Sequence, residues 1–224
     1  MNAENEKWIA AIASADYVKN GMIVGLGSGS TAAFMIAELG KRIAGGLIMK
    51  GVPSSDATAR LAKQAGISLL SLDEAGTMDI NIDGADEFDS KFQLIKGGGG
   101  ALLREKILAH NSRFNIIIAD SGKQVERLGK FKLPVETIPF ATETIISELS
   151  TMDLNPRLRM KNNEVYKTDE NNCILDIDIF QKDDLKALND VLIQIPGVVE
   201  TGLFLSSTDI VLMGQGNKVV TLKK

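Results

Sequence analysis

Histidine and cysteine are almost absent from this sequence, which has one of each, His110 and Cys173, in 224 residues. A single cysteine excludes an internal disulfide. The absence of disulfides is typical of proteins from reducing compartments. A single histidine excludes a histidine-rich metal site and any catalytic group that needs several imidazoles. His110 follows an apolar helical pattern, which favours a residue at a helix end over a catalyst.

Long apolar runs and an excess of basic charge are also lacking. No run approaches the about 20 residues needed to cross a bilayer. The N-terminus has neither a basic segment nor the uninterrupted apolar core of a secretory signal. The net charge of −4 gives no electrostatic reason to bind nucleic acid. We therefore expect a cytoplasmic protein that binds a small molecule, with no nucleic-acid or membrane partner.

The first part of the chain alternates short apolar runs with helical patterns, which predicts an α/β fold with a parallel sheet. A strand at residues 22–26 leads through a glycine-rich turn into a helix at residues 32–43. Further strands are expected at residues 47–52, 68–72, 78–82, 92–95 and 114–119, and further helices at residues 8–18, 57–65 and 101–109.

The pattern changes after about Gly129, where strands group around a predicted hairpin of residues 165–167 with 173–179. This favours a smaller α+β domain inserted at residues 130–202. The first domain would then consist of residues 1–129 plus 203–224, with the last strands returning to the first sheet. Within the insertion, strands are expected at residues 133–139 and 198–205, and helices at residues 141–149 and 183–193.

The first candidate site is the turn Gly27, Ser28, Gly29, Ser30 and Thr31. Glycines allow backbone N–H groups to approach an anion, and the helix that follows presents unpaired N–H groups and a positive dipole end. The three hydroxyl groups add donors, so the turn suits a phosphate. A tight strand-to-helix turn with capping hydroxyls is the alternative.

The same turn also matches a dinucleotide fingerprint through Gly27, Gly29 and Ala32. That motif needs an acidic residue about 20 positions further on, to bind a ribose hydroxyl. The second predicted strand ends in residues 52–55, which contain no carboxylate, and no Gly-Lys-Ser/Thr of a P-loop is present. A phosphate is therefore favoured over a nucleotide.

The second candidate is the run Asp83, Gly84, Ala85, Asp86 and Glu87, directly after a predicted strand. Three carboxylates at one strand end could bind a metal, form hydrogen bonds with sugar hydroxyls or move protons. A solvated turn is the remaining alternative.

The third candidate begins at Lys96, which precedes four glycines at residues 97–100. A lysine together with backbone N–H groups suits an enediolate oxygen. Glu105, about one turn into the following helix, could act as a base there. Its neighbours Arg104 and Lys106 favour the alternative of a surface glutamate.

Two lysines complete the set of candidates. Lys123 follows the strand predicted at residues 114–119, and the carboxyl end of such a strand borders the usual ligand crevice of an α/β sheet. Lys7 could reach a phosphate, although a solvated lysine is the simpler interpretation.

Taken together, these stretches resemble the A type of the ribose-5-phosphate isomerase family, over nearly the whole chain. The run of residues 83–87, DGADE, followed by the KGGGG of residues 96–100 and the REK of residues 104–106, is very specific. The other matching blocks are residues 23–32, 54–56, 128–130, 133–136, 195–199 and 202–204.

The resemblance implies a Rossmann-like domain with an inserted ferredoxin-like domain, a homodimer or homotetramer, and a reaction without metal or cofactor. It makes Glu105 the proton acceptor. For such a reaction we expect two further catalytic residues, Lys96 to stabilise the enediolate and Asp83 to assist ring opening. Lys7 is a further candidate for the phosphate, independently of the resemblance. The substrate-binding residues that the resemblance implies, besides Lys123, are Ser28, Gly29, Ser30, Thr31, Asp83, Gly84, Ala85, Asp86, Lys96, Gly97, Gly98 and Gly99.

The sequence departs from the family pattern at three positions. Ser28 and Leu103 stand where threonine is common, and Gly122 stands where serine is common. These departures concern affinity rather than the reaction. Two other functions stay open: a sugar-phosphate-binding regulator without turnover, and a phosphosugar enzyme that uses a metal at the carboxylates of residues 83–87.

Overall fold

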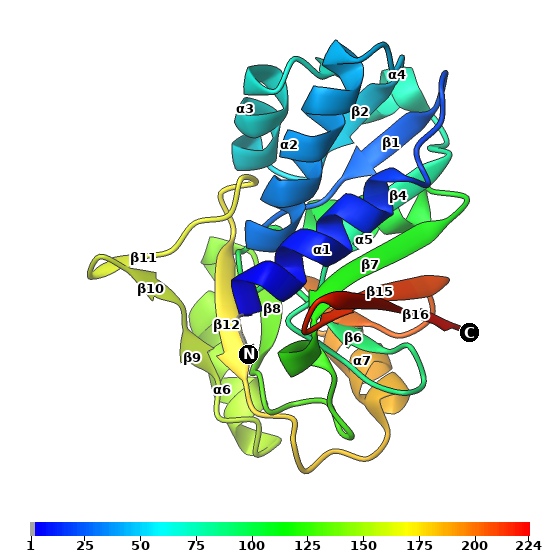
Figure 1. Ribbon diagram of the computed structural model, residues 1–224. Helices are drawn as coiled ribbons and strands as arrows, with labels where there is room; N and C mark the ends of the chain where they lie inside the picture. Colours follow the sequence, from blue (N-terminus) through cyan, green and yellow to red (C-terminus); the bar gives the residue numbers. More distant parts are fainter. Residues whose placement is uncertain (1–2) are drawn as a thin grey trace. The chain divides into compact units, whose positions relative to one another are not determined.

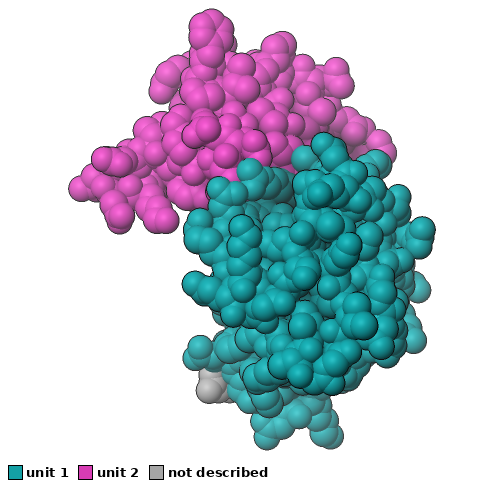
Figure 2. All heavy atoms as spheres, turned by 90° about the horizontal axis from the view of Figure 1, so that it is seen from above, with its two compact units in different colours: residues 1–85, 104–124, 206–224 teal, residues 86–103, 125–205 magenta. Residues whose placement is uncertain are grey.

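The computed structural model describes residues 3–224, which form two compact units (Figure 2). Unit 1 consists of the described residues up to Ala85, with residues 104–124 and 206–224. Unit 2 consists of residues 86–103 and 125–205. The domain boundaries predicted from the sequence placed residues 86–103, 125–129 and 203–205 in the first domain. Their contacts group them with unit 2, because short strands within residues 86–103 pair inside that unit.

Unit 1 contains a seven-stranded sheet in the order β16-β15-β7-β4-β1-β2-β3 (Figure 1). All neighbouring strands are parallel except β15 and β16, so the last two strands return to the first sheet as expected. The strands are β1 (Ile23–Leu26), β2 (Lys50–Pro53), β3 (Ser68–Leu69), β4 (Ile80–Gly84), β7 (Asn115–Asp120), β15 (Ile210–Gln215) and β16 (Lys218–Lys223).

Apolar side chains cover both faces of this sheet. In β1, Val24 and Leu26 belong to the large core that α1 and α2 share, whereas Ile23 packs with Leu108 of α5 in a smaller cluster. This is the alternation that a strand buried on both faces requires. The helices are α1 (Ala3–Ala15), α2 (Ser30–Ala44), α3 (Asp56–Gln64), α4 (Leu72–Ala75), α5 (Leu102–His110) and the short 3-10 helix η1 (Ser121–Lys123).

The strand order fixes where a ligand would bind. The chain runs from β1 outward to β2 and β3, and then crosses back to β4 and β7 on the other side of β1. In open α/β sheets ligands bind outside the carboxyl ends of the strands at such a reversal of order. Here these are the ends of β1 and β4, at Leu26 and Gly84.

Unit 2 is built on a four-stranded antiparallel sheet in the order β13-β8-β12-β9. Two helices pack on it through a core that includes Val135, Leu149 and Leu192. The succession strand–helix–strand–strand–helix–strand is that of a ferredoxin-like domain. The elements are β8 (Leu133–Thr137), η2 (Pro139–Ala141), α6 (Thr142–Thr151), β9 (Arg157–Leu158), β12 (Cys173–Ile177), α7 (Leu185–Gln194) and β13 (Val198–Thr201).

The expected hairpin of residues 165–167 with 173–179 is wrong. β11 (Glu164–Val165) pairs instead with β10 (Met160–Lys161), and β12 pairs with β8 and β9. Asn162 and Asn163 between β10 and β11 both have positive φ, 54° and 64°. Two such residues make the tight turn that closes a short hairpin, so the Asn pair decides the pairing.

The single strand expected at residues 198–205 is divided at Gly202. Its second half is β14 (Leu203–Phe204), which belongs to a separate three-stranded sheet with β6 (Leu94–Ile95) and β5 (Glu87–Phe88). A side chain at Gly202 would lie 2.3 Å from the carbonyl oxygen of Lys96. Only glycine therefore allows the chain to pass this close to Lys96.

Cutting the chain after Gly202 should abolish folding of unit 1. Such a chain lacks β15, which lies between β7 and β16 and supplies Ile210 and Leu212 to the core. Circular dichroism should show no cooperative thermal transition. A chain ending at Leu222, which loses only two exposed lysines, is the control and should melt like the full chain. A cooperative transition of the 202-residue chain near the wild-type temperature would contradict the interleaved fold.

Candidate functional site

Asp83 and the glycine turn meet at the reversal point of the unit 1 sheet. The Asp83 side chain is buried, and its Oδ1 accepts the N–H of Ser28 at 3.0 Å and the N–H of Gly84 at 2.7 Å. A Cβ at Gly27 would lie 2.1 Å from that oxygen. The glycine at position 27 is therefore required for the approach, which fixes the carboxylate between the ends of β1 and β4.

The N-terminus of α2 has the features of an anion site. Gly29 is its N-cap, with φ of 98°, and forms no side-chain cap bond. The N–H groups of the first turn are therefore not satisfied by a capping side chain. Lys7 of α1 donates to the hydroxyl of Ser30 at 3.3 Å, which places a positive charge beside this helix end. Thr31 follows and is buried.

A cluster of four hydrogen-bonded hydroxyl groups supports the glycine turn. The Ser28 hydroxyl lies 2.8 Å from those of Ser54 and Ser55, and 3.0 Å from that of Thr58. Thr58 in turn donates to the carbonyl of Gly27 at 3.0 Å. The Ser28 side chain thus bonds within the protein, as a support for the turn. Sequence analysis missed Thr58, which its position three residues after the cap Ser55 could have revealed.

Glu105 lies in the first turn of α5 and is only 5% exposed. Its neighbour Arg104 pairs with Asp56, at 2.9 Å between Nη1 and Oδ1. Arg104 and Glu105 thus lie in different surroundings although they are adjacent in the helix. The burial of Glu105 excludes its interpretation as a surface residue. A carboxylate is rarely buried unless it is paired or has a function.

Lys123 ends η1, directly after β7. Since β7 pairs with β4 in parallel, Lys123 belongs to the same sheet edge as Asp83. The carboxylate of Asp120 caps this short helix by accepting the N–H of Gly122 at 3.1 Å.

Glu6 is a buried residue that sequence analysis did not single out, and it fastens η1 to α1. Its Oε2 accepts the N–H and the hydroxyl of Ser121, at 3.0 and 2.7 Å, and its Oε1 accepts the N–H of Gly216 at 2.7 Å. These hydrogen bonds, that of Gly216 first, hold the pKa of the Glu6 carboxyl below its usual value. The carboxylate thus stays ionised while it anchors the turn that carries Lys123.

Unit 2 contains the remaining candidates, Asp86, Lys96 and the glycine loop, defined as residues 97–100. Asp86 Oδ2 accepts the N–H of Gly98 at 2.7 Å, so it orders this loop. The Lys96 side chain is buried, with its ammonium 5.5 Å from the centre of the Phe204 ring. The backbone of Lys96 is fixed by a bond from its N–H to the carbonyl of Gly202 at 2.9 Å.

Glu87, the third carboxylate of the acidic run, is a structural residue. It is buried, and its two oxygens accept the N–H groups of Gly129 at 2.8 Å and Phe131 at 2.6 Å. Because both Glu87 oxygens accept backbone N–H groups, Glu87 is not available as one of the three carboxylate ligands that the alternative of a metal site requires. Within residues 3–224 no group of three or more His, Cys, Asp or Glu side chains is arranged to hold a metal ion.

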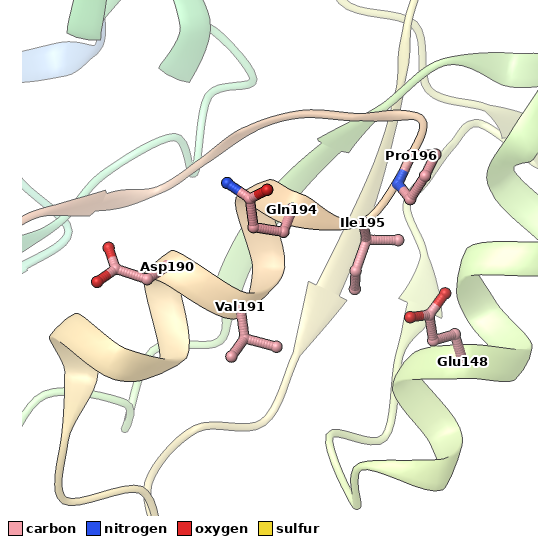
Figure 3. A pocket seen from close by; sticks show the side chains of 6 residues that line it. All are labelled: Glu148, Asp190, Val191, Gln194, Ile195 and Pro196. Carbon is pink, nitrogen blue, oxygen red and sulfur yellow. The ribbon is translucent and has the colours of Figure 1, made fainter.

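A pocket of about 420 Å³ lies elsewhere in unit 2, between α6 and the end of α7 (Figure 3). It contains none of the expected site residues. Two of its lining residues, Glu148 and Asp190, are acidic and would disfavour a phosphate. The other lining residues are Val191, Gln194, Ile195 and Pro196.

Comparison with known proteins identifies the family. Residues 50–218 match the family model of ribose 5-phosphate isomerase A, also described as phosphoriboisomerase A. This chain belongs to that family. A curated ribose-5-phosphate isomerase A from Ruegeria pomeroyi is 49% identical over 98% of this chain and 87% of its own length. Another from Limosilactobacillus reuteri is 46% identical over 92% of this chain and 93% of its own length.

Solved structures of the family have the same fold. Ribose 5-phosphate isomerase A from Methanocaldococcus jannaschii has a TM-score of 0.93 and 42% identity, and covers 97% of this chain and 98% of its own. A D-ribose-5-phosphate isomerase in complex with phospho-erythronic acid has a TM-score of 0.96 and 39% identity over the full length of both chains. The expected α/β fold is thereby confirmed. Across residues 3–224 the structure contains no helix of the length and apolarity that a membrane span requires.

Proposed function

We propose that this chain interconverts D-ribose 5-phosphate and D-ribulose 5-phosphate through an enediolate. The similarity to a curated ribose-5-phosphate isomerase A over 98% of the chain carries this proposal. The buried carboxylates of Asp83 and Glu105 supply groups that can move protons. The reaction needs no redox cofactor, because hydrogen only moves between neighbouring carbons of one molecule.

The phosphate is assigned to the N-terminus of α2, at residues 28–31, with Lys7 and Lys123 as its positive charges. The uncapped first turn of α2 and the contact of Lys7 with Ser30 support this assignment. A phosphate held away from the reacting carbons positions the sugar for reaction.

Glu105 is the proposed base that takes the C2 proton from the open aldose and returns it to C1. Asp83 assists ring opening and the exchange of a proton between O1 and O2. Its fixed Oδ1, which accepts two backbone N–H groups, supports a defined orientation of the carboxylate. Gly84, Ala85 and Asp86 border the sugar, and Asp86 orients its hydroxyls.

Lys96 and the N–H groups of the glycine loop are the proposed donors to the enediolate oxygens. The proton next to a sugar carbonyl is too weakly acidic for a carboxylate alone, so the developing charge must be stabilised. One such donor is worth roughly 3–4 kcal/mol. Phospho-erythronic acid, the ligand of the similar structure, has a planar carboxylate whose two oxygens resemble those of an enediolate.

The decisive experiment is ketose formation from ribose 5-phosphate by the purified chain in the presence of EDTA. We expect turnover to be unchanged by the chelator, since Lys96 and backbone N–H groups supply the electrophile. Free ribose should be a very poor substrate, because phosphate binding positions the sugar. Loss of turnover that a divalent cation restores would show a metal enzyme, and absence of any turnover would favour a regulator.

We also propose a cytoplasmic homodimer or homotetramer. The family resemblance supports the oligomer, and a single buried cysteine, Cys173, suits a reducing compartment.

A further inference from the structure

The glycine loop of unit 2 is clamped by a residue from a distant part of the chain. Arg159 donates through one nitrogen to the carbonyls of Gly97 at 2.9 Å and Gly98 at 3.1 Å. The rest of its guanidinium forms a two-point ion pair with Asp176, of which the bond from Nε to Oδ2 is 2.9 Å. Both charges are largely buried. Asp176 therefore fixes the position of the guanidinium independently of its contacts with the loop.

Tyr166 holds the next carbonyl of the same loop. Its hydroxyl donates to the carbonyl of Gly99 at 3.0 Å. Gly100 has φ of 87°, and a Cβ there would lie 2.2 Å from this hydroxyl. The Arg159 guanidinium also lies 6.0 Å from the centre of the Tyr166 ring. The side chains of Arg159 and Tyr166 thus bind three successive carbonyls together, and we call this pair the Arg–Tyr clamp.

The directions of the peptide groups follow from these contacts. In a trans peptide the C=O and the N–H of the next residue point in opposite directions. The carbonyl of Gly97 points to Arg159, and the N–H of Gly98 points to Asp86. The carbonyl of Gly98 also points to Arg159, so the N–H of Gly99 points away from the clamp.

Without the clamp the loop would be a poor anion site. Four consecutive glycines sample many backbone conformations, and in many of these a carbonyl oxygen would face the substrate. Such an oxygen would repel the negative charge that develops on the enediolate. The clamp therefore supplies the order that the glycine sequence itself lacks.

We infer that Arg159 and Tyr166 are positioning residues for the isomerisation, which hold the glycine loop with its carbonyls turned away from the reacting carbons and the Gly99 N–H presented to the enediolate. This inference rests on the proposed role of the loop in stabilising that enediolate. The opposing interpretation is that Arg159 and Tyr166 only stabilise unit 2.

The test compares Tyr166→Phe and Arg159→Lys in the full chain. Phenylalanine keeps the ring and removes only the donor to Gly99, and lysine keeps the charge but cannot bridge Asp176 and two carbonyls. We expect kcat to fall several-fold in Tyr166→Phe and roughly 10-fold or more in Arg159→Lys, below the roughly 10²–10³-fold cost of removing an oxyanion donor itself. KM for ribose 5-phosphate should change little, because the phosphate contacts remain.

The inhibition constant of phospho-erythronic acid separates positioning from stability. It should rise by about the same factor as kcat falls, whereas inhibition by inorganic phosphate should stay unchanged. The control is Tyr17→Phe, which alters the only other tyrosine of the chain, a residue packed against the core of unit 1. It should change none of these constants.

The inference is overturned if both variants keep the wild-type kcat and phospho-erythronic acid inhibition, whatever happens to their melting temperatures. Tyr166→Phe keeps the test valid if Arg159→Lys fails to fold. A third variant, Lys96→Met, separates a failure of the proposed enediolate stabilisation from a failure of the clamp alone. If Lys96→Met and both clamp variants all keep the wild-type kcat, the proposed stabilisation of the enediolate by Lys96 and the loop is wrong; if only Lys96→Met lowers kcat, only the clamp is wrong.

Discussion

Replacing Glu105 by glutamine should leave the protein folded and able to bind ribose 5-phosphate, but nearly inactive. Glutamine has almost the same shape as glutamate and cannot accept the C2 proton. We expect kcat to fall roughly 10²–10⁴-fold or more, the usual scale for general-base catalysis, with KM changed much less. Steady-state kinetics and a melting curve measure these effects.

The matched control is Glu143→Gln, which alters an exposed glutamate in the first turn of another helix, α6. It should keep the wild-type kcat. Substrate labelled with tritium at C2 should lose some label to water with the wild-type chain, because a protonated carboxylate can exchange its proton with solvent. A Glu105→Gln variant that retained most of its turnover would place the base elsewhere, with Asp83 the next candidate.

Local sequence patterns predicted the parts of the site that depend on neighbouring residues. The strand, glycine turn and helix from Met22 to Ile43 were correct because Gly27 and Gly29 permit a close approach and a positive φ, and these requirements are visible in the sequence. The position of Asp83 at a strand end followed from the same kind of pattern. Its contact with the N–H of Ser28 did not, because that contact depends on the order of β1 and β4 in the sheet.

Residues that act across a long separation in the sequence could not be predicted. Glu6 binds Ser121 and Gly216, and Arg159 binds the glycine loop some 60 residues earlier in the chain. Nothing in the sequence around either residue differs from an ordinary surface charge. The sequence also left undecided whether Glu105 is buried, because its charged neighbours Arg104 and Lys106 favoured a surface position. Only the packing of α5 in the folded chain decides this.

Replacing Lys96 by methionine should remove the main electrophile while preserving the fold. Methionine fills a similar volume and lacks the ammonium group that would stabilise an enediolate oxygen. We expect kcat to fall roughly 10²–10³-fold, the scale measured for the loss of one oxyanion donor. Since the charge on that oxygen develops only in the reaction, KM should change much less than kcat. The inhibition constant of phospho-erythronic acid should rise with the loss in kcat.

The control for Lys96→Met is Lys91→Met, which removes an exposed lysine five residues earlier in unit 2. It changes the net charge by the same amount, so a general electrostatic effect on an anionic substrate would appear in both variants. We expect only Lys96→Met to lose turnover, at every ionic strength tested. Equal kcat for the two variants, with circular dichroism showing both folded, would mean that the enediolate is stabilised without Lys96. The N–H groups of the glycine loop would then have to supply the whole effect, and disturbing the Arg–Tyr clamp would cost more than removing the lysine.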